Sequence, residues 1–245
     1  AGEYGAKVIK HSLSKGNGAA VKSGLKKVET EYVALMDGDG QHSVEDVISL
    51  YQEILREKLD LVVGARNRAG QASVFRHFAN QFYNKFASFM VGGEVRDLTS
   101  GIRVFRTKKV KPIIWMLPNT FSYPTTSTMI FYRLGYQVDF LDVKVKKANR
   151  PSHIRLFRDG FRFLLIIMKV GTLFSPFKLF VPVSLLMFSL GVIRYLYTFL
   201  LYGSFTNMSA LLIVSSVIVF LMGVLSEQIS MAIYSDIERK EFDSN

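Results

Sequence analysis

The 245-residue sequence contains no cysteine, which excludes a disulfide framework and any metal site built from thiolates. Its first residues lack the charged start and apolar core of a signal peptide. Acidic residues are scarce, 20 against 31 basic ones, and the imbalance is uneven: residues 1–178 carry +13 and residues 179–245 carry −2. Nucleic acid is one partner for such a basic segment. Because the basic charge borders long apolar runs, an anionic membrane surface is the better interpretation.

Two long apolar runs near the C-terminus predict membrane-spanning helices. They cover Phe180–Tyr202 and Ser209–Tyr234, about 23 and 26 residues, where a span needs roughly 20. A pair of buried core helices is the alternative, but it needs a far larger protein shell. The distribution of Lys and Arg predicts an integral, multi-pass membrane protein with its larger domain in the cytoplasm. Arg194 and Glu227 are charges within the spans; Glu227 is expected to face another subunit, which predicts a homo-oligomer.

The first 150 residues show strands alternating with helices, which predicts an α/β domain with a mainly parallel sheet covered on both faces. Ser43, followed by Asp46, is a good helix N-cap. The domains expected are 1–150 (catalytic), 151–177 (juxtamembrane), 178–235 (a hairpin of two spans) and 236–245 (a cytoplasmic tail). The strands expected are 6–10, 32–36, 59–65, 102–105 and 138–145, and the helices 16–28, 43–57, 73–91, 108–116 and 125–134.

The segment before the first span combines basic and apolar residues at helical spacing. Arg155, Arg158, Arg162 and Lys169 recur among Leu and Phe. This pattern predicts an amphipathic helix lying in the lipid headgroup layer. A solvated surface helix is the alternative.

Two aspartates follow a short apolar strand in the run Asp-Gly-Asp-Gly-Gln-His. Asp37 and Asp39 are costly to desolvate unless a cation sits between them, and a divalent metal carrying a nucleotide diphosphate is the obvious occupant. An ordinary polar turn is the alternative. An EF-hand loop is excluded, because His42 and Ile48 stand where that loop needs Gly and Glu.

Three further segments have residues suited to phosphate. The loop Lys-Gly-Asn-Gly from Lys15 opens a helix and offers a cation and free N–H groups, although a plain helix-entry turn fits equally well. Arg66 ends a strand and Arg76 begins the next helix, which suits bidentate phosphate recognition; solvated surface arginine is the alternative. Asp97 and Arg103 flank a turn before a strand, where a simple salt bridge is also possible.

In this order, Lys-Gly-Asn-Gly, Asp-Gly-Asp-Gly-Gln-His, Gly-Ala-Arg, Asp-Leu-Thr-Ser-Gly-Ile-Arg and two C-terminal spans resemble family 2 glycosyltransferases. The similarity is closest to the branch that loads a sugar onto polyprenyl phosphate, as in dolichyl-phosphate mannose synthases. The resemblance implies a GT-A fold, a UDP- or GDP-linked sugar donor, an undecaprenyl or dolichyl phosphate acceptor, and transfer with inversion.

The resemblance also implies roles for individual residues. Asp37 and Asp39 would hold Mg²⁺ or Mn²⁺ against the donor diphosphate, with Lys15 and Gln41 close by. Asp97, together with Asp39, would lie at the reacting centre. The residues expected at the acceptor phosphate are Arg66, Arg76, Arg103, Arg150 and Ser152.

The sequence departs from the family in lacking the initial Val-Pro-x-Tyr-Asn-Glu strand and a second strand ending in Asp-Asp-Gly-Ser, so a fragment is expected. Residues 125–128 also lack the acidic residue that many relatives carry there. Two other functions stay open. A polysaccharide synthase of the same fold is less favoured, because Trp115 lacks the Gln-x-x-Arg-Trp context. A non-catalytic, membrane-tethered accessory protein is consistent with the missing strands.

Overall fold

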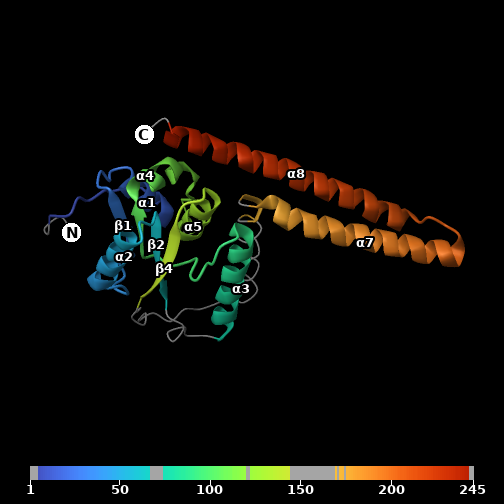
Figure 1. The fold of residues 1–245 in the computed structure, drawn as a ribbon, viewed down its shortest axis with the longest axis horizontal. Coiled ribbons are helices and arrows are strands. Elements are labelled where there is room, and N and C mark those ends of the chain that lie inside the picture. The colour runs from blue at the N-terminus through green and yellow to red at the C-terminus, as the bar shows by residue number, and fades with distance from the viewer. Residues whose placement is uncertain are drawn as a thin grey trace. The chain divides into compact units, whose positions relative to one another are not determined.

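The computed structural model describes residues 5–66, 74–119, 122–143, 169, 171–173 and 175–242, with side chains left out at 74–80, 238 and 240–242. The chain divides into two compact units (Figure 1). One comprises Ala1–His153 with Ile237–Asn245, and the other Ile154–Asp236. The juxtamembrane helix expected within 151–177 falls almost wholly outside the described residues.

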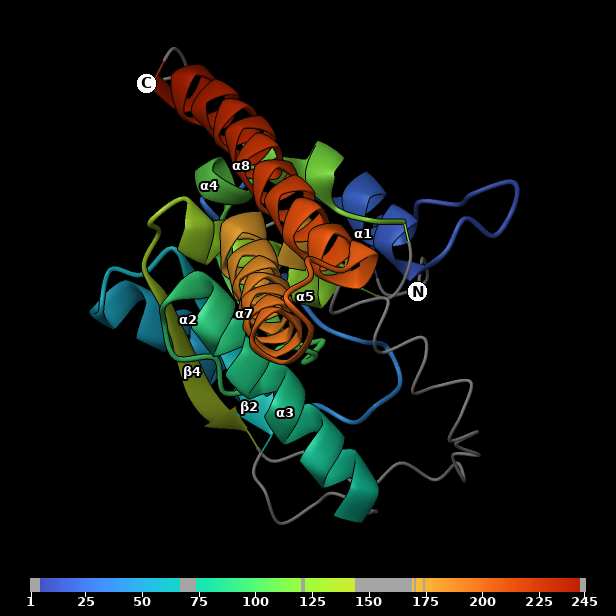
Figure 2. The same ribbon diagram turned by 90° about the vertical axis from the view of Figure 1, so that its right-hand side faces the viewer.

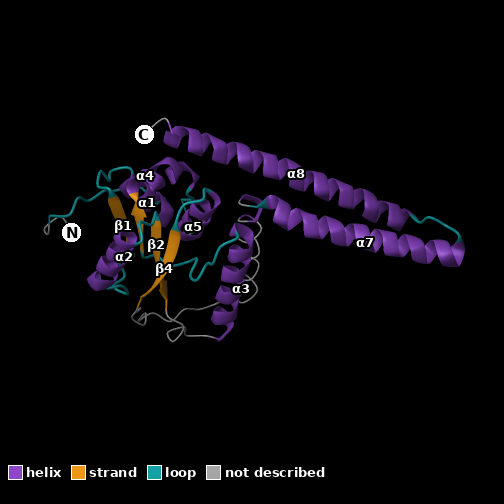
Figure 3. Cartoon of the chain, in the orientation of Figure 1, coloured by secondary structure: helices purple, strands orange, loops and turns teal. Residues whose placement is uncertain are grey.

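The first unit has a four-stranded sheet in the order β1 (Tyr32–Leu35), β3 (Arg103–Arg106), β2 (Leu61–Arg66), β4 (Val138–Val143) (Figure 3). β3 runs antiparallel to both β1 and β2, whereas β2 and β4 are parallel. The α/β class is confirmed, but the expectation of a mainly parallel sheet is wrong for the described strands. Because β3 alone is reversed, β1, β2 and β4 point in one direction.

The predicted strand at 6–10 is also wrong. All five residues are exposed and irregular, so their apolar side chains have no core to enter. The helices are α1 (Asn17–Leu25), α2 (Val44–Arg56), α3 (Val74–Val91), α4 (Thr107–Val110), the 3₁₀ helix η3 (Lys111–Met116) and α5 (Tyr123–Arg133). Ser43 caps α2 as predicted: its hydroxyl accepts the N–H of Asp46, whose carboxylate accepts the N–H of Ser43 in return.

Helices pack on both faces of the sheet. On one face, Leu50 and Ile54 of α2 are fully buried against Val62 and Val104 in the strands. On the other face, the rings of Phe105 on β3 and of Phe131 on α5 lie 5.3 Å apart. This alternation follows from the two-residue period of strands, which sends successive side chains to opposite faces.

The second unit contains α7 (Pro176–Tyr202) and, up to Asp236, α8 (Asn207–Phe242), two antiparallel helices that lie side by side (Figures 1 and 2). Both are long and apolar enough to cross a membrane, over Pro176–Tyr202 and Asn207–Ile237. The expected spans are confirmed as candidate membrane helices.

Small residues form the contact between α7 and α8. The buried ones recur every seventh position, which keeps one narrow seam facing the partner helix. A Cβ on Gly191 would come within 2.8 Å of Ile213 Cγ1, and one on Gly223 within 2.7 Å of Phe180 Cβ. The seam residues are Ser184, Gly191 and Thr198 on α7, and Ser209, Ser216, Gly223 and Ser230 on α8.

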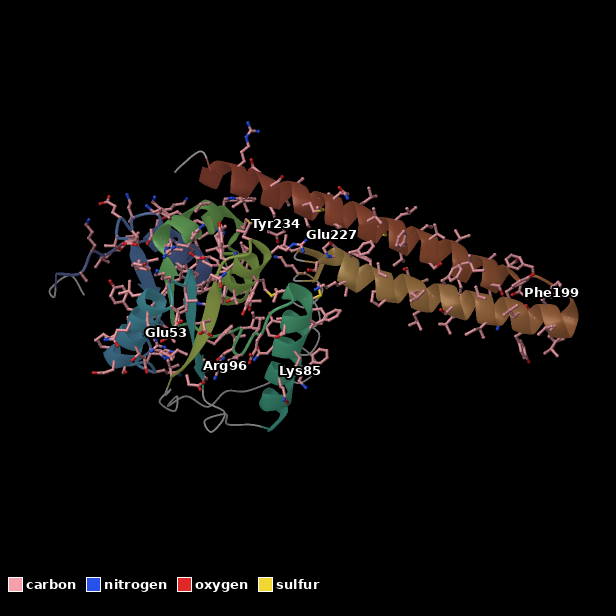
Figure 4. All side chains as sticks on the ribbon, in the orientation of Figure 1. Glu53, Lys85, Arg96, Phe199, Glu227 and Tyr234 are labelled. Atoms are coloured by element: carbon pink, nitrogen blue, oxygen red, sulfur yellow. The ribbon has the colours of Figure 1, made fainter. Side chains whose placement is uncertain are left out.

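Glu227 has its partner within the hairpin (Figure 4). Its carboxylate accepts the backbone N–H of Phe177 at 3.3 Å, in the first turn of α7. Ser230 and Tyr234, further along α8, donate to the carbonyl of Leu173 at 3.4 and 3.2 Å. A helix N-terminus leaves N–H groups unpaired, and a carboxylate satisfies them favourably. This partner means that Glu227 does not need another subunit to satisfy its carboxylate; that Glu227 faces another subunit in a homo-oligomer stays a prediction.

Candidate functional site

Three strand ends bring the predicted site residues to one edge of the sheet. Asp37 follows the carboxyl end of β1, and Arg66 ends β2. β3 runs the other way, so its amino end, with Arg103 paired opposite Leu35 and Val63, lies at the same edge. The reversed direction of β3 thus brings the segment Asp97–Arg103 next to the loop that contains Asp37.

Asp37 is half-buried and lies directly over Gly101. A Cβ on Gly101 would stand 2.0 Å from Asp37 Oδ2 and 2.7 Å from its Cγ, distances that no real Cβ contact shows. The absence of a side chain at this position therefore gives the Asp37 carboxylate its place. Sequence reasoning assigned Gly101 to a turn and missed this role, although its position directly before β3 was visible.

Asp39 is exposed in the loop between β1 and α2. Its Oδ1 accepts the backbone N–H of Gln41 at 3.1 Å, a local turn that Asp side chains commonly form. The Oδ2 atom makes no hydrogen bond to a described residue. Gln41 itself is half-buried. The loop thus holds one carboxylate toward the sheet edge and one toward solvent.

Asp97 holds Arg66 through a bidentate ion pair. Arg66 Nε donates to Asp97 Oδ2 at 2.7 Å and Nη2 to Oδ1 at 2.9 Å, and the Arg66 backbone N–H also donates to Oδ2 at 3.2 Å. Thr99 binds both, accepting from Arg66 Nη2 and donating its N–H to Asp97 Oδ1 at 3.2 Å. Such two-point pairs fix the plane of the guanidinium.

The electrostatics of this pair keep both groups charged. Burial alone would raise the pKa of Asp97, but the hydrogen bonds and charge of Arg66 and the N–H of Thr99 lower it below its usual value. The hydrogen bond that Arg66 donates to Asp97 in turn raises the pKa of Arg66, against the effect of burial. Asp97 is therefore an ionised orienting group and a weak proton acceptor. The Arg66 side chain is still 36% exposed.

Arg103 is fully buried, and in this structure no part of it is open to a phosphate. Its Nη1 donates to the carbonyl of Pro124 at 2.8 Å and to the hydroxyls of Ser127 and Thr128 at 2.9 and 3.1 Å, and its Nη2 donates to the carbonyl of Ser100. Burial lowers the pKa of Arg103 to about 10, which still leaves it protonated at neutral pH. Arg103 ties the amino end of α5 to the turn that carries Gly101.

The remaining predicted residues are Lys15, Arg76, Arg150 and Ser152. Lys15 is exposed in the loop before α1. Arg76 lies on α3, but its side chain is outside the described part of the structure. Arg150 and Ser152 also lie outside the described residues.

The donor set is compatible with one divalent ion held jointly by protein and substrate. The described residues contain no group of three or more His, Cys, Asp and Glu side chains placed to hold a metal. Asp37 and Asp39 supply two carboxylates, and Mg²⁺ is usually bound by one or two carboxylates plus substrate phosphates. The cluster of Asp37, Asp39, Asp97, Arg66 and Arg103 has one more carboxylate than guanidinium groups, so a divalent cation also reverses its excess charge.

Comparison with known proteins gives two family matches. Residues 1–114 match "Glycosyl transferase family 2", and residues 175–232 match "GtrB C-terminal hairpin". The first match contains Asp37, Arg66 and Asp97, and the second covers most of α7 and α8. The family 2 match confirms the resemblance that the motifs carry and the GT-A-like class that this resemblance implies.

Three curated relatives have names that include a polyprenyl phosphate. The chain is 28% identical over 178 residues to UDP-N-acetylglucosamine–dolichyl-phosphate N-acetylglucosaminyltransferase of Methanococcus voltae, covering 66% of this chain and 69% of that protein. It is 24% identical to dodecaprenyl-phosphate galacturonate synthase of Rhizobium johnstonii (44% and 32% covered). It is 27% identical to dolichyl-phosphate hexose transferase of Haloferax volcanii (46% and 50% covered). The matched region thus spans half or less of the last two proteins.

Among solved structures, glucosyl-3-phosphoglycerate synthase from Mycobacterium tuberculosis in complex with phosphoglyceric acid matches with a TM-score of 0.47 and 17% identity. The match covers 69% of this chain and 56% of that one. From the family matches and the motifs that lie within them, residues 1–114 are a glycosyl transferase family 2 domain, and a GtrB-type hairpin follows at residues 175–232.

Proposed function

We propose that the intact protein transfers a sugar from a nucleotide-sugar donor to a polyprenyl phosphate, with inversion and with a divalent metal. The observation that carries the proposal is the cluster of Asp37, Gly101, Arg66 and Asp97 at one sheet edge, within a family 2 domain. The printed names of the relatives, which include dolichyl- and dodecaprenyl-phosphate enzymes, support the lipid acceptor. The candidate membrane helices support a reaction at the bilayer.

Asp37 and Asp39 are proposed to hold Mg²⁺ or Mn²⁺, which supplies charge stabilisation for the departing nucleoside diphosphate. Asp37 is positioned by the bare backbone of Gly101, and Asp39 is open to solvent, where a soluble donor arrives. Lys15 and Gln41 are proposed to contact the same diphosphate. Without such positive charge, the excess carboxylate of the cluster repels a nucleotide.

The acceptor is proposed to meet Arg66. A phosphate monoester has a second pKa of about 6, so it is largely ionised at neutral pH and needs no strong base. This agrees with the lowered pKa of Asp97, which suits orientation of Arg66 better than proton abstraction. Arg76, Arg150 and Ser152 remain proposed contacts to the lipid phosphate. Arg103 is proposed to position the Ser100–Gly101 turn instead of binding phosphate.

The test is transfer from labelled nucleotide sugars to polyprenyl phosphate in membranes that contain the full chain. Asp39→Asn is expected to lower the rate by at least about 100-fold, since it removes a metal ligand and its charge. Asp139→Asn, at an exposed carboxylate on β4, is the matched control and should keep the rate. Unchanged transfer in Asp39→Asn contradicts the metal site. An elongating polymer as product favours a polysaccharide synthase, and no lipid-linked sugar with any donor favours an accessory protein.

A further inference from the structure

A cationic pocket lies between α1 and η3, apart from the strand-end cluster. It has a volume of about 390 Å³ and is lined by Lys22, Lys26, Lys111, Ile114 and Trp115. None of its lining residues is acidic. The pocket therefore combines three ammonium groups with an apolar wall, a combination that suits an amphiphilic anion.

The pocket is built into the fold by contacts on both sides. Lys22 is half-buried, and its Nζ donates to the carbonyl of Leu117 at 3.0 Å, which fixes the position of this ammonium group. Ile114 is nearly buried, at 6% exposure, so it forms a firm apolar base. Lys26 and Lys111 are exposed and form no ion pair with any residue in the described part of the chain.

Trp115 is the large apolar group at the rim. Its side chain is 58% exposed. Exposing an indole to water forgoes a large hydrophobic gain, and indoles favour the membrane–water interface, where the ring enters the glycerol region and the N–H stays hydrated. Lysine side chains can lay their apolar stems along such a surface while their ammonium groups meet lipid phosphates.

We propose that this face of the family 2 domain, formed by Lys22, Lys26, Lys111 and Trp115, docks on the anionic headgroups of the bilayer. Charge complementarity identifies anionic lipid as the occupant, because the face has three lysines and no carboxylate. Each lysine near the membrane surface raises the affinity for anionic lipid about fivefold. The candidate membrane helices of the same chain keep the bilayer within reach, so that each weak contact acts at high effective concentration. None of these residues belongs to the proposed transfer site.

The experiment uses the fact that Trp115 is the only tryptophan of the chain, so all indole emission reports this face. The full chain is reconstituted in nanodiscs of phosphatidylcholine, or of phosphatidylcholine mixed with phosphatidylglycerol, with brominated acyl chains as quenchers. We expect a blue-shifted, bromine-quenched Trp115 emission in the anionic discs and a much smaller effect in the neutral discs. Added salt should reverse the quenching.

The variants assign the contact to the lysines. Lys26→Gln with Lys111→Gln should weaken the contact equilibrium by about 25-fold, or about fivefold for each lysine. Lys85→Gln, on α3, removes one lysine charge from an exposed position outside the pocket, as each single pocket substitution does, and should leave quenching unchanged (Figure 4). Thermal melting of each variant checks the fold.

Three outcomes would overturn the proposal. The first is an emission that is the same, and unquenched, in both kinds of disc. The second is quenching that is equal in neutral discs or insensitive to the lysine substitutions. The third is an emission shift produced in detergent by inorganic phosphate alone and lost in the lysine variant, which would make the pocket a site for a soluble anion. Because transfer activity is not measured, failure here leaves the proposed function untouched.

Discussion

Gly101→Ala should displace the carboxylate of Asp37 while leaving the stability of the fold almost unchanged. The new Cβ would lie 2.0 Å from Asp37 Oδ2, so the oxygen must retreat by more than 1 Å to reach an ordinary contact of at least 3.4 Å. Gly101 does not have a positive φ, so its backbone accepts alanine. The clash involves only the far end of a side chain, and the free energy of unfolding should change by less than about 1 kcal/mol.

The functional cost should be much larger. A displacement of about 1 Å at a reacting centre can reduce the rate about 100-fold. We therefore expect Gly101→Ala to lower lipid-linked sugar formation about 100-fold and to weaken Mn²⁺ binding, followed by the electron paramagnetic resonance signal of free Mn²⁺. Gly24→Ala is the matched control: its Cβ meets nothing within 4 Å inside α1, so activity and Mn²⁺ affinity should stay unchanged.

A double-mutant cycle tests whether the effect passes through Asp37. In an Asp37→Ala background the obstructing carboxylate is gone, so adding Gly101→Ala should change Mn²⁺ affinity no further. Full additivity of the two substitutions would refute the reasoning. Wild-type Mn²⁺ affinity and rate in Gly101→Ala would refute it as well, because they would show that the placement of Asp37 over this glycine has no functional role.

Three further substitutions test other parts of the structure. The pKa of Asp97 is lowered in the folded protein, so its ion pair with Arg66 stabilises the fold above the unfolded pKa of about 3.9 and loses that effect as the pH falls below it. The loss of stability caused by Asp97→Asn, measured by urea unfolding, should therefore be constant from neutral pH down to about pH 5. In stronger acid this loss should become smaller. Gly191→Val places a branched side chain against α8 and should weaken the hairpin by about 1–3 kcal/mol, measured by the distance between spin labels on the two helices; an unchanged distance distribution would contradict the small-residue seam. Glu227→Leu removes the acceptor for the Phe177 N–H and should fray the start of α7, at a cost of about 1 kcal/mol. Glu227→Gln keeps a carbonyl acceptor for the same N–H. The amide hydrogen of Phe177 should therefore exchange faster in Glu227→Leu than in Glu227→Gln.

Features fixed by local chemistry could be predicted from the sequence. Ser43 and Asp46 stand three residues apart at a helix start, and the structure shows the reciprocal cap that this spacing predicts. The loop from Asp37 to Gln41 follows an apolar strand and lies at its carboxyl end. In both cases the determining contacts lie within a few residues of one another.

Features fixed by distant contacts were missed. A four-residue strand carries no sign of its own direction, so the reversal of β3 could not be predicted from the segment Arg103–Arg106. A guanidinium is usually exposed to water. The carbonyl and hydroxyl groups of α5 that replace this water around Arg103 lie more than 20 residues away in sequence, so the residues next to Arg103 do not predict them. The seven-residue repeat of Ser209, Ser216 and Gly223 was readable, but average hydropathy hides small residues among large apolar ones.

The two charged regions of the first unit should respond differently to ions. The cluster around Asp37 has an excess of carboxylate, so under the proposed function a diphosphate would bind there together with a divalent cation, and its occupancy should follow the concentration of that cation. The pocket of Lys22, Lys26 and Lys111 is cationic by itself, so it attracts anionic lipid directly and weakens with any monovalent salt. Raising NaCl at constant Mn²⁺ should therefore release Trp115 from the bilayer while metal binding at the cluster persists. Parallel loss of both would mean that one electrostatic field governs the two sites.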